Sequence, residues 1–452
     1  MRREPSVLIV GALLCGATLA ACASPDSAAP APSTSSASAS PSTTTTTAPS
    51  PTAATGTATA TPSATPTTTP QPIAASISGL HVAGVQDGAW PDSNVPVGSL
   101  RLWDSGTSWS QIETTRGRYD WAQLDESVDN AESNGVDDIL LVLGTTPAWN
   151  AKRIDAADYP APGAASAPRD IDAWDRYVAA VAKRYAGRIT SYQVWNEASL
   201  SMFWDGTPEQ MADLTERAYR IIKDIDPGAT VVAASTTVRL EGAFDRFFTG
   251  YLAALKERDW PVDVLAVHLY PASRDDTDAR AEFIAQVRDT LTAVQAPDLP
   301  LWDTELNYGL AGPGPTNPRQ SIEGSRARDW VVQTTMDSLA LGIARTYWYI
   351  WTPEPYPLLG MQLTNGSGAV KGLRVVDQWL VGGELLGCTE EAGLASCDVT
   401  KSGVPTRIVW SIDGPAALAP PAGFSEVCRT DNTCAPVDGA IELDETPVRL
   451  LP

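Results

Sequence analysis

The stretch Ser191–Ala198, which reads SYQVWNEA, decides how the rest of the chain is interpreted. Its first half is rich in aromatic and β-branched residues, which predicts a strand. Asn196 and Glu197 follow where that strand should end. Downstream, Leu299–Glu305 repeats this design, with an apolar strand that closes on Glu305. A single glutamate after a strand is usually a solvated loop residue, so the pair is informative only if the fold brings both carboxylates together.

The composition excludes several classes of function. A formal net charge of −22 makes the chain a poor ligand for nucleic acids and for anionic membranes. The only histidines are His81 and His268, too few for a His-rich zinc or iron site. There is also no G-x-S-x-G motif for a serine nucleophile. We therefore expect no metal and no cofactor. Fifteen Trp residues against six Phe are compatible with sugar stacking, although most of them should pack in the core.

The N-terminus has the features of an export signal. Two arginines precede the apolar run Val7–Leu14, which is too short to span a membrane. The following Leu19–Cys22 resembles a bacterial lipobox, in which Cys22 would be lipidated and become the mature N-terminus. We therefore interpret residues 1–22 as a lipoprotein signal peptide. Cleavage after Ala23, which would release a soluble protein, is the alternative.

Residues 23–75 are interpreted as a disordered linker. Most of this segment consists of Ser, Thr, Ala and Pro, so it contains almost nothing that could build a core. Proline stiffens such a segment and extends its reach. The predicted location is the outer face of a bacterial membrane or the cell wall, with the lipid as the only membrane contact.

Residues 76–381 contain eight strand-like runs with helical stretches between them. The runs are apolar throughout rather than alternating, which is typical of strands covered by helices. This predicts an α/β fold, a (β/α)8 TIM barrel. A doubly wound sheet is the alternative, but it would need a Gly-rich phosphate loop, and none is present. The predicted strands are Ile77–Val85, Val97–Trp103, Asp138–Gly144, Ile189–Trp195, Ala229–Ala234, Val262–Leu269, Leu299–Thr304 and Ala344–Trp351.

The predicted helices carry recognisable start signals. Thr207 is an N-cap followed by Pro208 and by the capping-box residue Gln210. Asp170 is expected to cap another helix. Further helices are expected near Trp121–Asn134, Phe244–Arg258, Asp278–Val294, Ser325–Leu341 and Leu373–Leu380.

Five motifs occur where barrel strands should end. Together they resemble the clan A glycoside hydrolases, most closely glycoside hydrolase family 39 and its bacterial endoglycosidase-like members. The resemblance covers roughly residues 77–381 and implies a (β/α)8 enzyme that retains anomeric configuration. The motifs are R-L-W-D at 101–104, G-T-T-P-A-W at 144–149, W-N-E at 195–197, H-L-Y at 268–270 and W-D-T-E at 302–305.

The resemblance assigns roles to five residues. It implies that Glu197 is the general acid/base and Glu305 the nucleophile. Asn196 would bond the sugar 2-hydroxyl, Tyr270 would hold the nucleophile and Arg101 would keep it ionised. These roles agree with physical expectation, because a nearby arginine lowers a carboxyl pKa whereas an apolar setting raises it.

The other candidate substrate contacts each have a structural alternative. Arg101 can be an ion pair inside the barrel, and His268 and the tyrosine of its motif can be satisfied core residues. Trp149 can line a sugar groove or pack under a loop. Trp348 and Trp351 have opposite parity on an ideal strand, and we expect Trp348 to face the site.

Residues 382–452 are predicted to form a small all-β, sandwich-like module. Strand-like pieces lie at Arg407–Trp410, Phe424–Cys428 and Val448–Leu451. Its four cysteines allow three pairings. We expect the two local disulfides, because export favours oxidation and the spacing lacks the C-x2-C pairs of zinc sites. The expected pairs are Cys388 with Cys397 and Cys428 with Cys434.

The functional hypothesis is a monomeric retaining glycoside hydrolase that cleaves a cell-surface or environmental polysaccharide. Two carboxylates on separate strand ends are the minimum equipment for that reaction. Transglycosylation by the same residues and non-catalytic carbohydrate binding at the cell surface are the alternatives.

Overall fold

The structure, a computed structural model, describes residues 70–271, 278–310 and 320–452. The predicted signal peptide, Cys22 and most of the predicted linker lie outside the described residues. In the described part of the chain, none of the helices combines the length and apolarity needed to cross a lipid bilayer.

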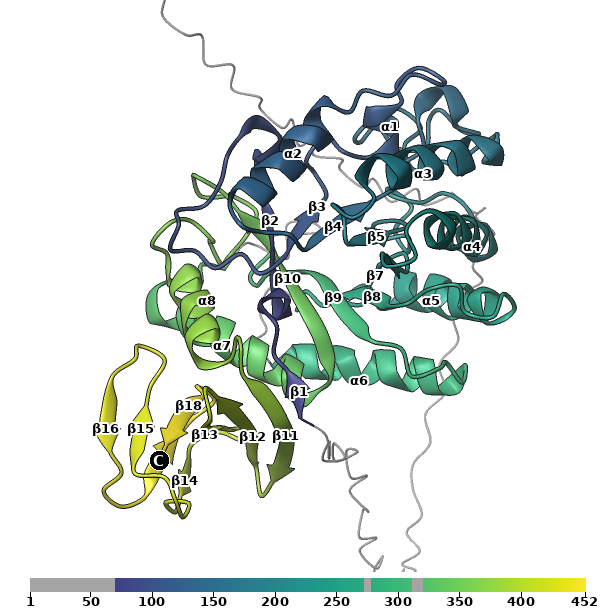
Figure 1. Cartoon of the computed structure of the whole chain (residues 1–452). Helices are drawn as coiled ribbons and strands as arrows, with labels where there is room; N and C mark the ends of the chain where they lie inside the picture. The colour runs from purple at the N-terminus through teal and green to yellow at the C-terminus, as the bar shows by residue number, and fades with distance from the viewer. Residues whose placement is uncertain (1–69, 272–277, 311–319) are drawn as a thin grey trace, which may run out of the picture. The chain divides into compact units, whose positions relative to one another are not determined.

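A parallel sheet closes into the predicted barrel (Figure 1). Its strand order is β6-β5-β4-β3-β2-β10-β9-β8-β7. β6 and β7 are two pieces of one barrel strand, and the bridge between Val232 and Val264 joins that strand to the start of β8. All eight predicted strands are confirmed. The strands are β2 (Ser78–Val82), β3 (Leu100–Leu102), β4 (Ile139–Val142), β5 (Ser191–Gln193), β6 (Thr230–Val232), β7 (Thr236–Thr237), β8 (Leu265–His268), β9 (Leu301–Leu306) and β10 (Ile343–Trp351).

Helices cover the outside of the sheet, as the apolar runs predict. Thr207 and Gln210 form the expected capping box, and the Asp170 side chain accepts a hydrogen bond from the backbone of Asp172. The last barrel helix begins five residues earlier than predicted, because Ser367 caps it. The helices are α1 (Trp109–Ile112), α2 (Ala122–Ser133), α3 (Ile171–Tyr185), α4 (Pro208–Ile225), α5 (Glu241–Lys256), α6 (Asp278–Ala293), α7 (Gly324–Ala340) and α8 (Gly368–Trp379), with 3-10 turns η1 (Ala75–Ile77), η2 (Val85–Asp87) and η3 (Ala148–Asn150).

The barrel has two apolar layers. Ile139 and Leu141 of β4 belong to the large cluster between sheet and helices, whereas Leu140 belongs to a separate cluster. Since successive strand side chains point to opposite faces, this second cluster fills the barrel interior. Its members are Leu140, Val232, Val264, Ala266, Trp302 and Tyr347.

The C-terminal residues form the predicted all-β module. A seven-stranded antiparallel sheet has the order β1-β11-β12-β13-β18-β15-β16, and β17 pairs with β14 in a second small sheet. Ile441 and Leu443 of β17 pack against Val409 of the larger sheet, which produces the sandwich-like core. The strands are β11 (Glu384–Glu391), β12 (Leu394–Lys401), β13 (Val404–Ser411), β14 (Ala416–Leu418), β15 (Glu426–Cys428), β16 (Cys434–Pro436), β17 (Ile441–Leu443) and β18 (Val448–Leu451).

Two details of the module bear on the predictions. Cys388 is joined to Cys397 and Cys428 to Cys434, each pair bridging neighbouring antiparallel strands. The linker boundary at residue 75 needs correction, because β1 (Gln71–Pro72) pairs with β11. The apolar side chain of Ile73 is buried there, so the ordered chain begins before the predicted limit.

Candidate active site

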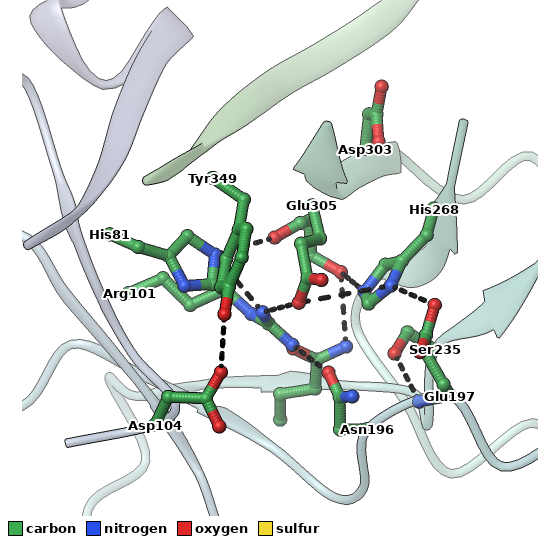
Figure 2. A network of polar contacts seen from close by, with 12 residues as sticks. His81, Arg101, Asp104, Asn196, Glu197, Ser235, His268, Asp303, Glu305 and Tyr349 are labelled. Atoms are coloured by element: carbon green, nitrogen blue, oxygen red, sulfur yellow. Dashed lines mark hydrogen bonds and ion pairs between the residues drawn. The ribbon is translucent and has the colours of Figure 1, made fainter. Parts of the chain in front are cut away.

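The side chains of the site come from separate barrel strands and meet at the strands' C-terminal ends (Figure 2). Arg101 lies in β3, His268 ends β8 and Glu305 lies in β9. Glu197 follows β5, and Tyr349 lies in β10. In a parallel barrel all these ends share one face, where residues distant in sequence converge. The fold therefore brings the two predicted carboxylates together.

Glu305 is held by two hydrogen-bond donors. Arg101 Nη1 lies 2.9 Å from its Oε2, and the Tyr270 hydroxyl donates to its Oε1 at 2.8 Å. Burial raises the pKa of Glu305, whereas the neighbouring His268 and Arg101 oppose that rise. Burial also lowers the pKa of His268 to about 3, so that imidazole is neutral near pH 7. Arg101 is then the cation in contact with the carboxylate.

Glu197 lies in a strained turn. Its φ is +41°, in the left-handed region that non-glycine residues rarely adopt. The buried Ser235 fastens this turn, because its Oγ accepts from the Glu197 backbone N–H at 2.9 Å and its carbonyl accepts from Ala198 at 2.9 Å. Such strain persists only where surrounding contacts enforce it, and it is common at functional sites.

The Glu197 carboxyl group is set up to hold a proton. Its side chain is only 13% exposed. Burial raises its pKa to about 7, although Arg239 and Arg101 oppose the rise, and Asp104 adds to it. The protonated form of Glu197 is therefore well populated near neutral pH.

A chain of hydrogen bonds connects the two carboxylates. Arg101 Nε donates to Gln193 Oε1 at 2.9 Å, which leaves Gln193 Nε2 to donate to Thr304 Oγ1 at 3.2 Å. Thr304 Oγ1 also lies 3.1 Å from His268 Nε2. Among the described residues, His268 Nε2 is the acceptor within reach of the Thr304 hydroxyl, so Thr304 donates its hydrogen to that nitrogen. His268 then carries its hydrogen on Nδ1, 3.1 Å from Glu197 Oε1.

Asn196 is oriented by the same arginine. Arg101 Nη2 lies 2.7 Å from Asn196 Oδ1. Because a guanidinium only donates, this atom is the amide oxygen, and the amide N–H groups remain as donors. His81 completes the surroundings of Arg101, with its Nε2 3.1 Å from Nη1.

The two carboxyl groups face each other across a short gap. One oxygen of Glu197, one oxygen of Glu305 and one ring nitrogen of His268 all lie within 4.8 Å of one another. The same three residues have the chemistry of metal ligands. However, Arg101 already supplies positive charge to Glu305. Two facing carboxyl groups of different proton affinity can act as a nucleophile and an acid.

The predicted tryptophans lie away from this network. Trp348 is fully buried and packs against Tyr308, with ring centroids 6.2 Å apart, so its assignment to the site must be corrected. Trp351 is also buried and donates to Asn365 at 3.1 Å. The reason is strand alternation: Tyr347 belongs to the barrel-interior cluster and Tyr349 reaches the site, so Trp348 between them faces the covering helices. Trp149, partly buried, donates to the Glu113 carbonyl at 2.7 Å.

Sequence reasoning missed the aromatic residue that does reach the site. Tyr349 directs its hydroxyl to Asp104 at 2.7 Å, and its ring meets the edge of His81 at 5.0 Å. Asp104 was left unassigned, although it ends the R-L-W-D motif that contains Arg101. Gln193 and Ser235 belong to none of the five motifs, and no sequence signal pointed to either residue.

Comparison with known proteins gives likeness of fold. No protein-family model matches the sequence, and no curated protein matches it. A family 39 glycoside hydrolase from Bacteroides cellulosilyticus WH2 superposes with a TM-score of 0.62 at 13% identity, over 84% of this chain and 81% of that one. A monomeric β-xylosidase from Caulobacter crescentus CB15 has a TM-score of 0.58 at 15% identity, over 84% and 97%.

A more distant similarity involves a family 51 arabinofuranosidase from Xanthomonas axonopodis pv. citri. Its TM-score is 0.51 at 12% identity, over 84% of this chain and 96% of that chain. At such identities the similarity concerns the fold alone. The chain therefore has the TIM-barrel architecture used by these glycoside hydrolases, and its chemistry must be inferred from its own side chains.

Proposed function

We propose that the chain is a retaining glycoside hydrolase that cleaves O-glycosidic bonds in a polysaccharide. The observation that carries the proposal is the gap of at most 4.8 Å between oxygens of Glu197 and Glu305. Retaining glycosidases hold their carboxyl groups about 5–5.5 Å apart, whereas inverting enzymes need about 6.5–9.5 Å to admit a water molecule. The glycoside hydrolases among the structural neighbours support the same chemistry.

In the first step Glu305 attacks the anomeric carbon while Glu197 protonates the departing glycosidic oxygen. The result is a covalent glycosyl ester on Glu305. Arg101 and Tyr270 keep the attacking carboxylate in place and ionised. In the second step Glu197, now deprotonated, takes a proton from water, which attacks the anomeric carbon and releases Glu305. Asn196 donates to the sugar 2-hydroxyl, a bond that strengthens as positive charge develops on the ring.

The experiment that tests this mechanism traps the ester. A 2-fluoro glycoside of the sugar that the enzyme cleaves should add one glycosyl mass to the peptide containing Glu305. The first product released, followed by NMR, should keep the configuration of the substrate. An inverted product would contradict the proposal, as would label on another peptide.

We also propose that the enzyme acts outside the cell, tethered by Cys22. Two disulfides in the module support an oxidising compartment. One structural neighbour is described as a conserved exported protein from Bacteroides fragilis. Labelling cells with a radioactive fatty acid should mark the wild-type protein and leave Cys22→Ser unlabelled. Equal labelling of both would contradict the assignment of Cys22.

A further inference from the structure

A second polar cluster lies beside the carboxylate pair, on the side of the site formed by β3 and β10. Asp104 follows β3 with a φ of +61°. Both of its carboxylate oxygens accept a phenol hydrogen: Tyr349 donates to Oδ2 at 2.7 Å, and Tyr159 donates to Oδ1. Figure 2 shows Tyr349 between His81 and Asp104, away from Glu197. Asp104, Tyr159 and Tyr349 have no role in the proposed reaction.

Within this cluster the two tyrosine hydroxyls are the donors and Asp104 is the acceptor. Partial burial and the neighbouring Asp104 carboxylate raise the pKa of Tyr159 and Tyr349 above 10, so both phenols stay protonated. Each phenol has one hydrogen and directs it to Asp104. Desolvation raises the pKa of Asp104, and the two donated bonds and the charge of Arg101 oppose that rise by stabilising the ionised carboxylate. What remains for a ligand is a set of oxygen lone pairs, which only accept hydrogen bonds.

The cluster is accessible to a ligand. Asp104 is exposed, and Tyr159 is 49% exposed. Asp104 and Tyr159 also border a shallow, solvent-open recess whose walls include Trp103, Thr107 and Gln111. The exposed ring of Tyr159 beside several oxygen acceptors is a combination that suits a sugar ring, with its apolar C–H faces and its hydroxyl groups.

The arginine next to this cluster has little capacity left for an anion. Arg101 is 1% exposed, and its N–H groups already meet Gln193, His81, Glu305 and Asn196. An anionic substituent beside Asp104 would therefore meet acceptors and a like charge. Burying a charge without a partner is strongly unfavourable.

We propose that Asp104, Tyr159 and Tyr349 form a sugar-binding subsite that accepts only hydrogen-bond donors. The ligand group is a neutral hydroxyl or a protonated amine of a substrate sugar near the cleavage point. Sugars with a carboxylate or sulfate at this position are rejected. The inference rests on the proposed glycosidase function and narrows its substrate class to neutral or amino-sugar polymers.

The first test is a comparison of substrate classes with the wild-type enzyme. Purified neutral glucans, xylans, arabinans and galactans are assayed beside chitosan, alginate and polygalacturonate for release of reducing ends. The subsite predicts turnover among the neutral polymers or chitosan. Preferred turnover of alginate or polygalacturonate would overturn the subsite and leave the glycosidase function intact. No turnover of any polymer would count against the glycosidase function itself.

The second test replaces the central carboxylate. On the polymer that the enzyme cleaves best, Asp104→Asn should lower kcat/KM roughly tenfold to a hundredfold, because the bonds lost are to a charged acceptor. Asp158→Asn is the matched control, since it removes an exposed carboxylate one residue from Tyr159. Both variants should melt at the wild-type temperature. Equal kcat/KM for Asp104→Asn and wild type would overturn the subsite.

Discussion

The β9 side and the β5 side of the site surround the same chemical group in opposite ways. Glu305 sits within strand β9 and receives hydrogen bonds from Arg101 and Tyr270. Glu197 sits in a strained turn past the end of β5, next to the neutral imidazole of His268. Burial raises the pKa of both carboxyl groups, but Glu305 is in contact with donors that oppose the rise, whereas the pKa of Glu197 reaches about 7. In the proposed mechanism, environment rather than residue type therefore separates nucleophile from acid.

The largest expected effect comes from removing the β9 carboxylate. Glu305→Gln should lower kcat by about four orders of magnitude or more, because an amide cannot form the glycosyl ester. Steady-state rates on the cleaved polymer measure this loss. The thermal melting curve should still show one folded protein. Turnover within tenfold of wild type would mean that the two sides do not differ as described.

Removing the β5 carboxylate should have a smaller effect that depends on the leaving group. Glu197→Gln should lower kcat/KM about 10²- to 10⁴-fold on a natural glycan, the usual contribution of general acid catalysis. A dinitrophenyl glycoside needs no protonation to depart, so its first step should be nearly unaffected. Added azide should then speed turnover and form a glycosyl azide. A loss of equal size on both substrates would remove Glu197 from the role of acid.

Weakening the support of the nucleophile should cost less than removing it. Tyr270→Phe loses one hydrogen bond to a charged acceptor, worth about 1.5–3 kcal/mol, so kcat/KM should fall roughly tenfold to a hundredfold. Tyr185→Phe is a suitable control, because its hydroxyl bonds Asp125 on the outside of the barrel. If both variants kept wild-type kinetics, Tyr270 would have no part in holding Glu305.

The smallest expected effect is a displacement of the pH profile. The acid must be protonated, and the pKa of Glu197 is about 7, so kcat/KM should fall as pH rises through 7. Thr304→Val removes the hydroxyl that places the His268 hydrogen on Nδ1. Without that hydroxyl the hydrogen can move to Nε2, and a bare Nδ1 facing Glu197 disfavours the carboxylate. The pKa of Glu197 should then rise, so the alkaline limb should move up by less than about one pH unit.

The pH profiles of wild type, Thr304→Val and Thr290→Val should be measured together. Thr290 lies on α6, and its hydroxyl bonds only within its own helix, to the Gln286 carbonyl at 2.9 Å. Thr290→Val should therefore keep the wild-type profile. A downward movement of the alkaline limb in Thr304→Val would contradict the direction derived for the hydrogen-bond chain.

Most of the barrel could be predicted because its signals are local. Continuous apolar runs mark buried parallel strands, and capping residues such as Thr207 and Asp170 mark helix starts. The positions of Glu197 and Glu305 followed from the same local pattern, since each comes at the end of an apolar run. The ends of helices and the start of the ordered chain were predicted less well, as Ser367 and Gln71 illustrate.

The aromatic contacts of the site were harder, because a run of residues does not show which face of a strand turns toward the barrel interior. Alternation along β10 places Tyr347 and Tyr349 on one face and Trp348 on the other, and Trp348 was the wrong choice. The inner face is set by the pairing of β10 with β2 and β9, which no single run of residues encodes. The Tyr159 contact with Asp104 likewise joins two segments 55 residues apart.

The amino-acid sequence alone determined the eight-strand barrel, the β module and the two acidic residues at strand ends. It could do so because hydrophobic periodicity and capping act over a few residues. Only the tertiary structure decided the distance between Glu197 and Glu305, the direction of the hydrogen bonds from Arg101 to His268, and the neighbours of Asp104. Those features set proton affinity and ligand choice, and they depend on burial and on atoms contributed by different strands, which exist only once the barrel has closed.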